Sequence, residues 1–248
     1  MDGSHRPTTT PATTLSTRAS GPITGRAALG RLVPVLFVLA VAVDLASLAA
    51  GSEAGHLAAK PLLMPLLATW AALRGAPRLL IVALLFGWGG DVLLLSDAEP
   101  AFLAGMASFA VGHVCYLVLF RRTGPPRARA ALLAPAYVLT LTGTVALLWP
   151  DLPTDLRVPV ASYSVLLTAM AYLAVTRVGL VAGLGGALFL LSDTLIATGV
   201  AEWPQLPRPD FWVMLTYIAA QFLLTRGLLS GRRATAAPQG EPRSITAV

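Results

Sequence analysis

The sequence predicts an all-α protein, a polytopic membrane bundle of eight transmembrane helices, and three observations support this prediction. Hydrophobic residues make up 56% of the chain and charged residues only 12%, whereas about a quarter of the residues in soluble domains are charged. Apolar runs long enough to cross a bilayer recur along most of the length. The basic residues between these runs fall mainly in alternate loops, as in multi-pass membrane proteins.

The apolar runs define a transmembrane domain over residues 29–230, with a tail on each side. The Thr/Pro-rich tail 1–28 and the basic tail 231–248 are predicted to be disordered, because neither can bury enough apolar surface to fold. Eight segments are predicted to span the membrane, at residues 32–50, 61–73, 79–95, 101–120, 130–149, 158–176, 179–199 and 211–229. The second segment is short and needs neighbouring residues to cross. The first could be a cleaved signal peptide, but its length and Asp44 favour a retained helix.

The charges of the loops predict that the N-terminus and the C-terminus are both cytoplasmic. With eight spans in this orientation, only Lys60, Arg157 and Arg208 of the 18 lysines and arginines lie outside, where most acidic loop residues also gather. Adding or removing one span would destroy this bias, which follows the positive-inside rule. The net charge of +6 is thereby explained by membrane topology, and no nucleic-acid partner is expected. The single cysteine, Cys115, excludes an intramolecular disulfide and a cysteine-based zinc site.

Two similar strings raise the question of which aspartates are functional. GGDVLLLSD ends at Asp97 and GGALFLLSD ends at Asp193, so an alignment pairs these two residues and leaves Asp91 opposite Ala187. Asp97 follows the third span and is expected in an exposed loop or at a helix cap, whereas Asp193 lies within the seventh span. The glycines near the start of the seventh span, Gly179 and Gly183, form a G-x-x-x-G pair that favours close helix packing. The repeat alone therefore does not identify the functional acids.

Three acids fall within predicted spans, namely Asp44, Asp91 and Asp193. Counted from the nearest cytoplasmic arginines at 1.5 Å per residue, all three sit about 20–24 Å from the inner surface, in the outer half of the bilayer. Burying a carboxylate in a bilayer costs a few kcal/mol, so such residues usually face a polar cavity. We therefore expect a shared polar site at this depth.

Other polar residues are predicted at the same depth. His113 and Tyr116 lie one turn apart on the fourth span, and Tyr217 and Gln221 are similarly spaced on the eighth, so each pair shares a helix face. Lys60 opens the second span at its outer end. Any one of them could be a helix–helix hydrogen-bond partner, an interfacial tyrosine or a snorkelling lysine. Their convergence on one layer instead predicts a buried polar site.

The ordered motifs KPL (60–62), GD (90–91), FAVGHVCY (109–116), FLLSD (189–193) and TYIAAQ (216–221) resemble those of the YhhN-like lysoplasmalogenase family. The resemblance covers roughly residues 30–229. Members are similar eight-span proteins, and characterised ones hydrolyse the vinyl ether bond of lysoplasmalogens to a fatty aldehyde and a glycerophospho-head group. It implies a multi-pass hydrolase of the cell membrane that acts on a lysophospholipid such as an alkenyl-glycerophosphocholine or -ethanolamine. The high Ala and Arg content suggests a bacterial inner membrane.

The resemblance also implies roles for individual residues. The catalytic acids would be Asp91 and Asp193, whereas Asp44 matches no family motif and its role stays open. The substrate-binding or supporting residues would be Lys60, His113, Tyr116, Tyr217 and Gln221. Cleavage of a vinyl ether proceeds by protonation to an oxocarbenium ion that water captures, and two carboxyl groups in unlike environments can provide the acid and the base. No metal and no cofactor are required.

Two alternatives remain open at this point. A transporter or a lipid-binding protein could use the same intramembrane polar site, because intramembrane aspartates are common in proton-coupled carriers. Another hydrolase of ether or amide lipids would also fit. Analysis of the products separates these functions, because a carrier releases none and an amidase releases no aldehyde.

Overall fold

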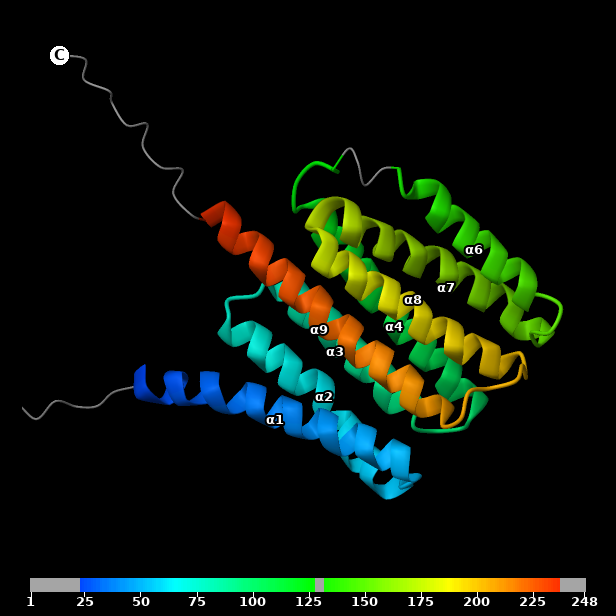
Figure 1. Ribbon diagram of the computed structural model, residues 1–248, viewed down its shortest axis with the longest axis horizontal. Coiled ribbons are helices and arrows are strands. Elements are labelled where there is room, and N and C mark those ends of the chain that lie inside the picture. Colours follow the sequence, from blue (N-terminus) through cyan, green and yellow to red (C-terminus); the bar gives the residue numbers. More distant parts are fainter. Residues whose placement is uncertain (1–22, 128–131, 237–248) are drawn as a thin grey trace, which may run out of the picture.

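The computed structural model describes residues 23–127 and 132–236, and helices joined by short loops are the only regular secondary structure in this part of the chain (Figure 1). A π-helical turn, η1 (Ala174–Val178), joins helix α7 (Thr154–Leu173) to helix α8 (Leu180–Val200). The α-helices are α1 (Ile23–Ala50), α2 (Glu53–Leu73), α3 (Arg78–Leu93), α4 (Glu99–Arg121), α6 (Ala134–Leu148), α7 (Thr154–Leu173), α8 (Leu180–Val200) and α9 (Pro209–Ala236).

Each of the eight predicted apolar segments forms a helix, which confirms the all-α fold class and the helical membrane bundle. Within the described residues, six helices are long and apolar enough to cross a membrane: α1, α2, α4, α7 with its π-helical turn, α8 and α9. The protein is therefore a multi-pass membrane protein. Helices α3 and α6 have only 16 and 15 residues. Eight crossings and the cytoplasmic location of both termini stay predictions.

Three helices, α1, α2 and α9, extend far beyond the predicted bounds. Helix α1 begins at Ile23 and α9 ends at Ala236, so both continue past the limits of the predicted domain, 29–230. The remainder of the two predicted tails lies outside the described residues. Helix α2 begins at Glu53 rather than near residue 61, so the helix that contains the short predicted segment 61–73 has 21 residues.

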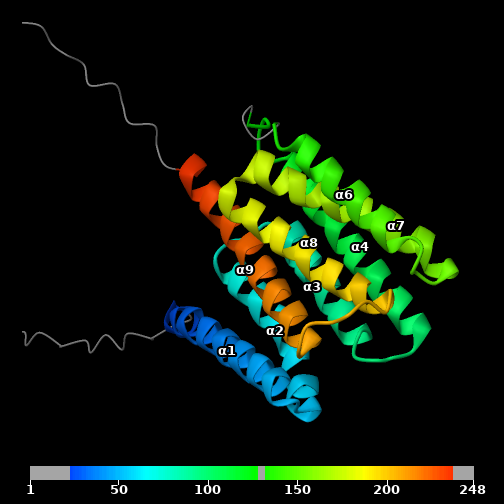
Figure 2. The ribbon, with the colours of Figure 1, turned by 45° about the vertical axis from the view of Figure 1, so that its right-hand side comes forward.

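The helices are arranged with α1 at one edge of the bundle and α6 and α7 at the opposite edge (Figure 1). The view turned by 45° shows the same order (Figure 2). The closest neighbours are α8 with α9, α3 with α4, and α1 with α2. Helices α3, α4, α8 and α9 thus form the centre of the bundle, and they carry most of the polar residues predicted for the site.

The outer surface of the bundle is strongly apolar. Large side chains such as Val38, Leu139 and Leu184 are 63%, 72% and 56% exposed. Exposed large apolar side chains along most of the helices are the expected surface of a protein in lipid. Helix α6 is the extreme case, because Leu148 is its only fully buried residue.

Glycines allow α8 to approach its neighbours closely. A Cβ atom at Gly186 would lie 2.7 Å from Cα of Ala171 on α7, and one at Gly185 would lie 2.8 Å from the backbone nitrogen of Leu224 on α9. This close approach is the packing mode that small residues permit in membranes. Gly179 has a different role, because it precedes α8 with φ of 137°, a conformation that favours glycine.

A backbone carbonyl that a proline leaves free in α2 forms a hydrogen bond to α3. Pro65 has no N–H to donate to the carbonyl of Pro61, one turn earlier. The indole nitrogen of Trp88 on α3 donates to that carbonyl instead, at 2.9 Å. The bond holds α3 against α2 directly beside Lys60, the residue that precedes Pro61.

Candidate active site

Asp91 lies near the C-terminal end of α3 and is only 2% exposed. The phenol of Tyr217 on α9 donates a hydrogen bond to its Oδ2 atom at 2.8 Å. The side-chain amide of Gln221 donates to the oxygen of Tyr217 at 3.4 Å, and its carbonyl accepts a hydrogen bond from Tyr116 on α4 at 2.8 Å. A continuous chain of hydrogen bonds therefore connects α3, α9 and α4.

The glycines of α3 make room for this chain of hydrogen bonds. A Cβ atom at Gly87 would lie 3.0 Å from Nε2 of Gln221 and 3.2 Å from the hydroxyl of Tyr217. A Cβ atom at Gly90 would overlap the ring of Phe109. Because the glycines of GWGGD have no side chains, residues of α4 and α9 can pack directly against the backbone of α3 beside Asp91.

Asp193 lies on α8 and is held by a second tyrosine. The phenol of Tyr163 on α7 donates a hydrogen bond to Oδ2 of Asp193, and Nε2 of His113 on α4 lies 3.0 Å from the same phenol oxygen. The ring of His113 packs edge-on against Phe189 with their centroids 4.7 Å apart, and His113 is 1% exposed. Three helices therefore fix the position of this carboxyl group.

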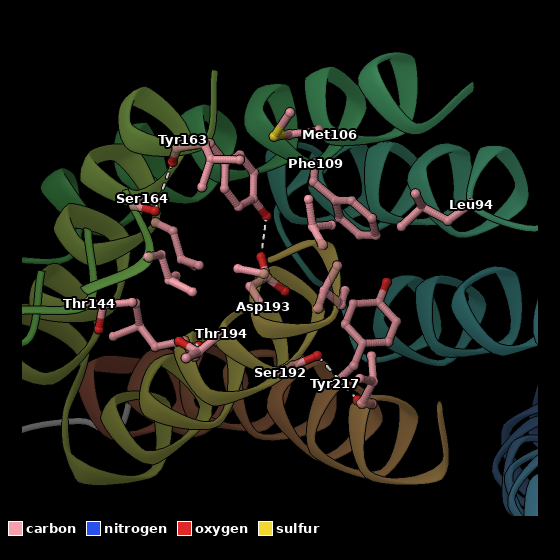
Figure 3. Close-up of a pocket in the computed structure, with 18 of the residues that line it drawn as sticks. Leu94, Met106, Phe109, Thr144, Tyr163, Ser164, Ser192, Asp193, Thr194 and Tyr217 are labelled. Atoms are coloured by element: carbon pink, nitrogen blue, oxygen red, sulfur yellow. Dashed lines mark hydrogen bonds between the residues drawn. The ribbon is translucent and has the colours of Figure 1, made fainter. Parts of the chain in front are cut away.

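The two aspartates line one pocket. Figure 3 shows the part of this pocket around Asp193. The pocket has about 1030 Å³ of empty space, a volume that includes the space at its open side. Its other polar lining includes Lys60, Tyr163 and Tyr217, and most of the rest is apolar side chains from α4, α6, α7, α8 and α9. In Figure 3 the phenol of Tyr163 points across the pocket to the carboxyl group of Asp193.

One oxygen of each carboxyl group is left for a ligand. In Asp91 and in Asp193 the Oδ2 atom accepts a tyrosine hydrogen bond, whereas the Oδ1 atom has no hydrogen-bond partner within residues 23–127 and 132–236. Across the same described residues, no three His, Cys, Asp or Glu side chains are grouped as metal ligands are.

Lys60 is the cation of the pocket. It lies on α2, is 8% exposed and lines the pocket together with Asp91, with which it interacts electrostatically. In the part of the chain that the structure describes, no carboxylate lies within ion-pair distance of its ammonium group. Because a buried charge without a partner is costly, this position favours an anionic ligand.

Asp44, whose role the sequence leaves open, lies outside the pocket. It is fully buried on α1, and its Oδ1 atom is 2.8 Å from Nδ1 of His56 near the start of α2. The bond ties α1 to α2. Of the three acids in predicted spans, only Asp91 and Asp193 therefore reach the pocket.

The structure places the predicted site residues in two layers. Lys60, Asp91, Asp193 and Tyr217 line the pocket. The residues His113, Tyr116 and Gln221 lie behind it and are each 1% exposed. Asp97 is exposed after the end of α3, as its position in the sequence predicts.

Tyr163 is the site residue that the sequence analysis missed. It precedes Arg177, at the inner end of the same predicted span, by 14 residues, which corresponds to a depth of about 21 Å. This is the depth of the three intramembrane acids, so the same calculation applied to hydroxyl groups would have identified it. His56, the partner of Asp44, was also missed, because it precedes the apolar segment predicted at 61–73.

Comparison with known proteins decides the family. The model of the YhhN family matches residues 55–228. The chain belongs to the YhhN family. It is 36% identical over 157 residues to the Homo sapiens protein named lysoplasmalogenase TMEM86B, and 34% identical over 168 residues to the Mycobacterium tuberculosis protein named lysoplasmalogenase. These matches cover 62% of this chain, and 65% and 62% of the two relatives. No solved structure matches.

The chain thus matches slightly less than two thirds of the length of these two YhhN relatives. The family match begins within α2 and ends within α9, so it contains every residue that lines the pocket, Lys60 included. Helix α1 and its Asp44 precede the matched segment, which agrees with the absence of Asp44 from the motifs that indicated the family.

Proposed function

We propose that this YhhN protein is a hydrolase of the cell membrane that cleaves the vinyl ether bond of a lysophospholipid. The products would be a fatty aldehyde and a glycerophospho-head group, and the head group would be choline or ethanolamine. The observation that carries the proposal is the pair Asp91 and Asp193, which line one pocket with one oxygen of each held by a tyrosine. The relatives named lysoplasmalogenase support the same reaction.

The composition of the pocket suits an amphiphile with one chain. Its largely apolar walls would hold the alkenyl chain, and the ammonium group of Lys60 would meet the phosphate of the head group. An ammonium–phosphate contact is a charge-assisted hydrogen bond, which is about twice as strong as a neutral one. The vinyl ether, which joins the chain to the head group, would then lie between these regions, where the two carboxyl groups line the pocket.

The proposed reaction uses the two carboxyl groups in turn. One carboxyl group donates its proton to the double-bond carbon that is not bonded to oxygen. The electron pair of the double bond forms the new C–H bond, and the carbon bonded to oxygen becomes part of an oxocarbenium ion. The other carboxylate stabilises this cation and accepts a proton from water as the water oxygen bonds to the cationic carbon. As the hemiacetal collapses, its hydroxyl proton returns to the first carboxylate while the C=O bond of the aldehyde forms. The bond to the ether oxygen breaks, and that oxygen takes the proton held by the second carboxyl group and leaves as the alcohol. One molecule of water is consumed for each vinyl ether cleaved, and both carboxyl groups regain their starting protonation states.

The test is an assay of released aldehyde with purified full-length protein and an alkenyl-lysophospholipid. Asp91→Asn and Asp193→Asn should each lower kcat/KM by about 10²–10⁴-fold, the usual contribution of a general acid or base. Asp97→Asn is the matched control, because this exposed residue lies outside the pocket, and it should retain the wild-type rate. Wild-type turnover by both pocket variants would overturn the mechanism. Absence of aldehyde from the wild-type protein would overturn the proposed function.

A further inference from the structure

Tyr163 belongs to none of the motifs that indicate the family, yet it makes two polar contacts in the pocket. Its hydroxyl donates to Oδ2 of Asp193 and lies 3.0 Å from Nε2 of His113. Its ring also lines the pocket. A tyrosine used only for packing would not connect an acid of the pocket to the buried histidine behind it.

The order of the hydrogens along this connection follows from counting donors. A phenol has one hydrogen, and Tyr163 gives it to the carboxylate of Asp193, so its oxygen accepts from His113. His113 must then carry its hydrogen on Nε2. This agrees with its buried Nδ1 atom, which has no partner among the described residues and is best left without a hydrogen. The donor direction is therefore His113 to Tyr163 to Asp193.

The arrangement around Asp91 follows the same pattern. There an N–H of Gln221 donates to Tyr217, and Tyr217 donates to the carboxylate. In both cases a buried N–H group holds a tyrosine, and the tyrosine occupies one oxygen of an acid that lines the pocket. Two independent sets of helices produce this pattern, α3 with α9 and α8 with α7 and α4, which argues against a chance contact.

We propose that Tyr163 is a positioning residue that orients Asp193, and that His113 holds Tyr163 in place. With Oδ2 occupied, the carboxyl group cannot rotate freely, and Oδ1 is kept toward the substrate. Orientation matters because proton transfer requires heavy atoms within about 3 Å and falls steeply when the donor is misplaced. The inference rests on the proposed hydrolysis. Since that reaction returns its proton, Tyr163 and His113 need only orient the acid and not carry protons away.

The first experiment replaces only the hydroxyl group. Tyr163→Phe should lower kcat for the alkenyl-lysophospholipid by about 10–100-fold, because misplacing a reacting group by about 1 Å can cost about 100-fold. KM should stay within about two-fold, because Tyr163 is not assigned to substrate binding. Tyr172→Phe is the matched control on the same helix: it packs against Tyr137, does not line the pocket, and should keep the wild-type kcat.

A double-mutant cycle tests whether His113 acts through Tyr163. His113→Phe should lower kcat several-fold, and adding it to Tyr163→Phe should cause little further loss, because residues acting as one unit are not additive. The losses of Tyr163→Phe and Tyr217→Phe should instead multiply, because these tyrosines hold different acids. Independent, multiplying losses for His113 and Tyr163 would overturn the role given to His113.

The outcomes separate this inference from the proposed function. A wild-type protein that releases no aldehyde would overturn the proposed function and with it the inference. An active wild-type protein whose Tyr163→Phe variant keeps kcat within two-fold would overturn the inference alone. Thermal unfolding of each variant in detergent identifies loss of folding. If Tyr163→Phe does not fold, the His113→Phe variant decides, and an unchanged kcat in that variant overturns the inference.

Discussion

Among the residues of the pocket, Lys60 is the one proposed to bind the phosphate of the head group. The acids and tyrosines are joined by hydrogen bonds, whereas Lys60 has neither an ion pair nor a hydrogen bond within the described residues. Its helix is fixed beside α3 by the bond from Trp88 to Pro61. A positioned ammonium group without a protein partner is suited to bind the phosphate of the substrate.

Removal of this charge should weaken binding of the phosphate selectively. Lys60→Met should raise KM for an alkenyl-lysophospholipid by about 10–100-fold, because a hydrogen bond to a charged group contributes about 1.5–3 kcal/mol. With an alkenylglycerol, which has no phosphate, the KM of the same variant should stay near the wild-type value. Steady-state kinetics on the two substrates measure the difference. Equal changes in KM for both would exclude phosphate binding by Lys60.

At the scale of single elements, α8 controls the geometry of the pocket. Helix α8 packs against α9 at Gly185 and against α7 at Gly186. Asp193 lies about two turns later on the same helix. Tyr163 and Tyr217, the partners of the two acids, lie on these same neighbouring helices. The close packing at these two glycines therefore sets the distances from α8 to α7 and α9, the helices that carry the two tyrosines.

A methyl group at this contact should loosen the bundle. A Cβ atom at Gly185 would meet the backbone nitrogen of Leu224 at 2.8 Å and the backbone oxygen of Ala220 at 2.9 Å, and backbone atoms cannot move aside as side chains can. Gly185→Ala should thus lower stability by about 1–3 kcal/mol, as overpacking usually does. Thermal unfolding in detergent measures it, with a lower aldehyde rate expected in parallel.

Gly143→Ala is the control for that substitution. Gly143 lies in α6, and a Cβ atom there would meet nothing within 4 Å. Alanine is a better helix former than glycine by about 1 kcal/mol, so the unfolding temperature should stay the same or rise slightly. A fall equal to that of Gly185→Ala would mean that the close contact with α9 is not the cause.

For the whole molecule, the distribution of polar and apolar groups matches that of a single-chain lipid. The outer surface is apolar, and the acids and the lysine are gathered in a pocket inside the bundle. A single-chain lipid shares this distribution, because its chain is apolar and its head group is charged. The orientation of the protein in the bilayer then decides from which side of the membrane the head group of the substrate enters the pocket.

Both termini and the loop after α4 are predicted to be cytoplasmic, and the loop after α3 is predicted to be outside. A membrane-impermeant maleimide should label Asp97→Cys in intact cells, and Thr123→Cys only after permeabilisation. The two positions flank the opposite ends of α4, and the native Cys115 is buried, so it should not react. The opposite pattern would reverse the orientation, and labelling of both positions from outside would exclude α4 as a membrane span.

The repeated strings show the limit of local patterns. Aligned residue by residue, they pair Asp97 with Asp193, but Asp97 is exposed beyond the end of α3 and Asp193 lies within α8. Depth in the bilayer and the family motifs instead join Asp193 to Asp91, and the structure puts those two in one pocket. Depth alone did not separate Asp44, which lies at a similar level but pairs with His56.

The sequence by itself determined the class of the protein, the approximate position of its helices and the family. It also named both acids and five polar residues that the structure places in or behind the pocket, namely Lys60, His113, Tyr116, Tyr217 and Gln221. The class and the helix positions depend on the length and hydropathy of each segment, which the thickness of the bilayer constrains. Only the tertiary structure decided which groups meet: Tyr217 with Asp91, 126 positions apart, and Tyr163 with Asp193, 30 positions apart. Such contacts depend on which helices are neighbours and how each is rotated about its axis. Packing between helices sets both, and hydropathy along one helix does not contain that information.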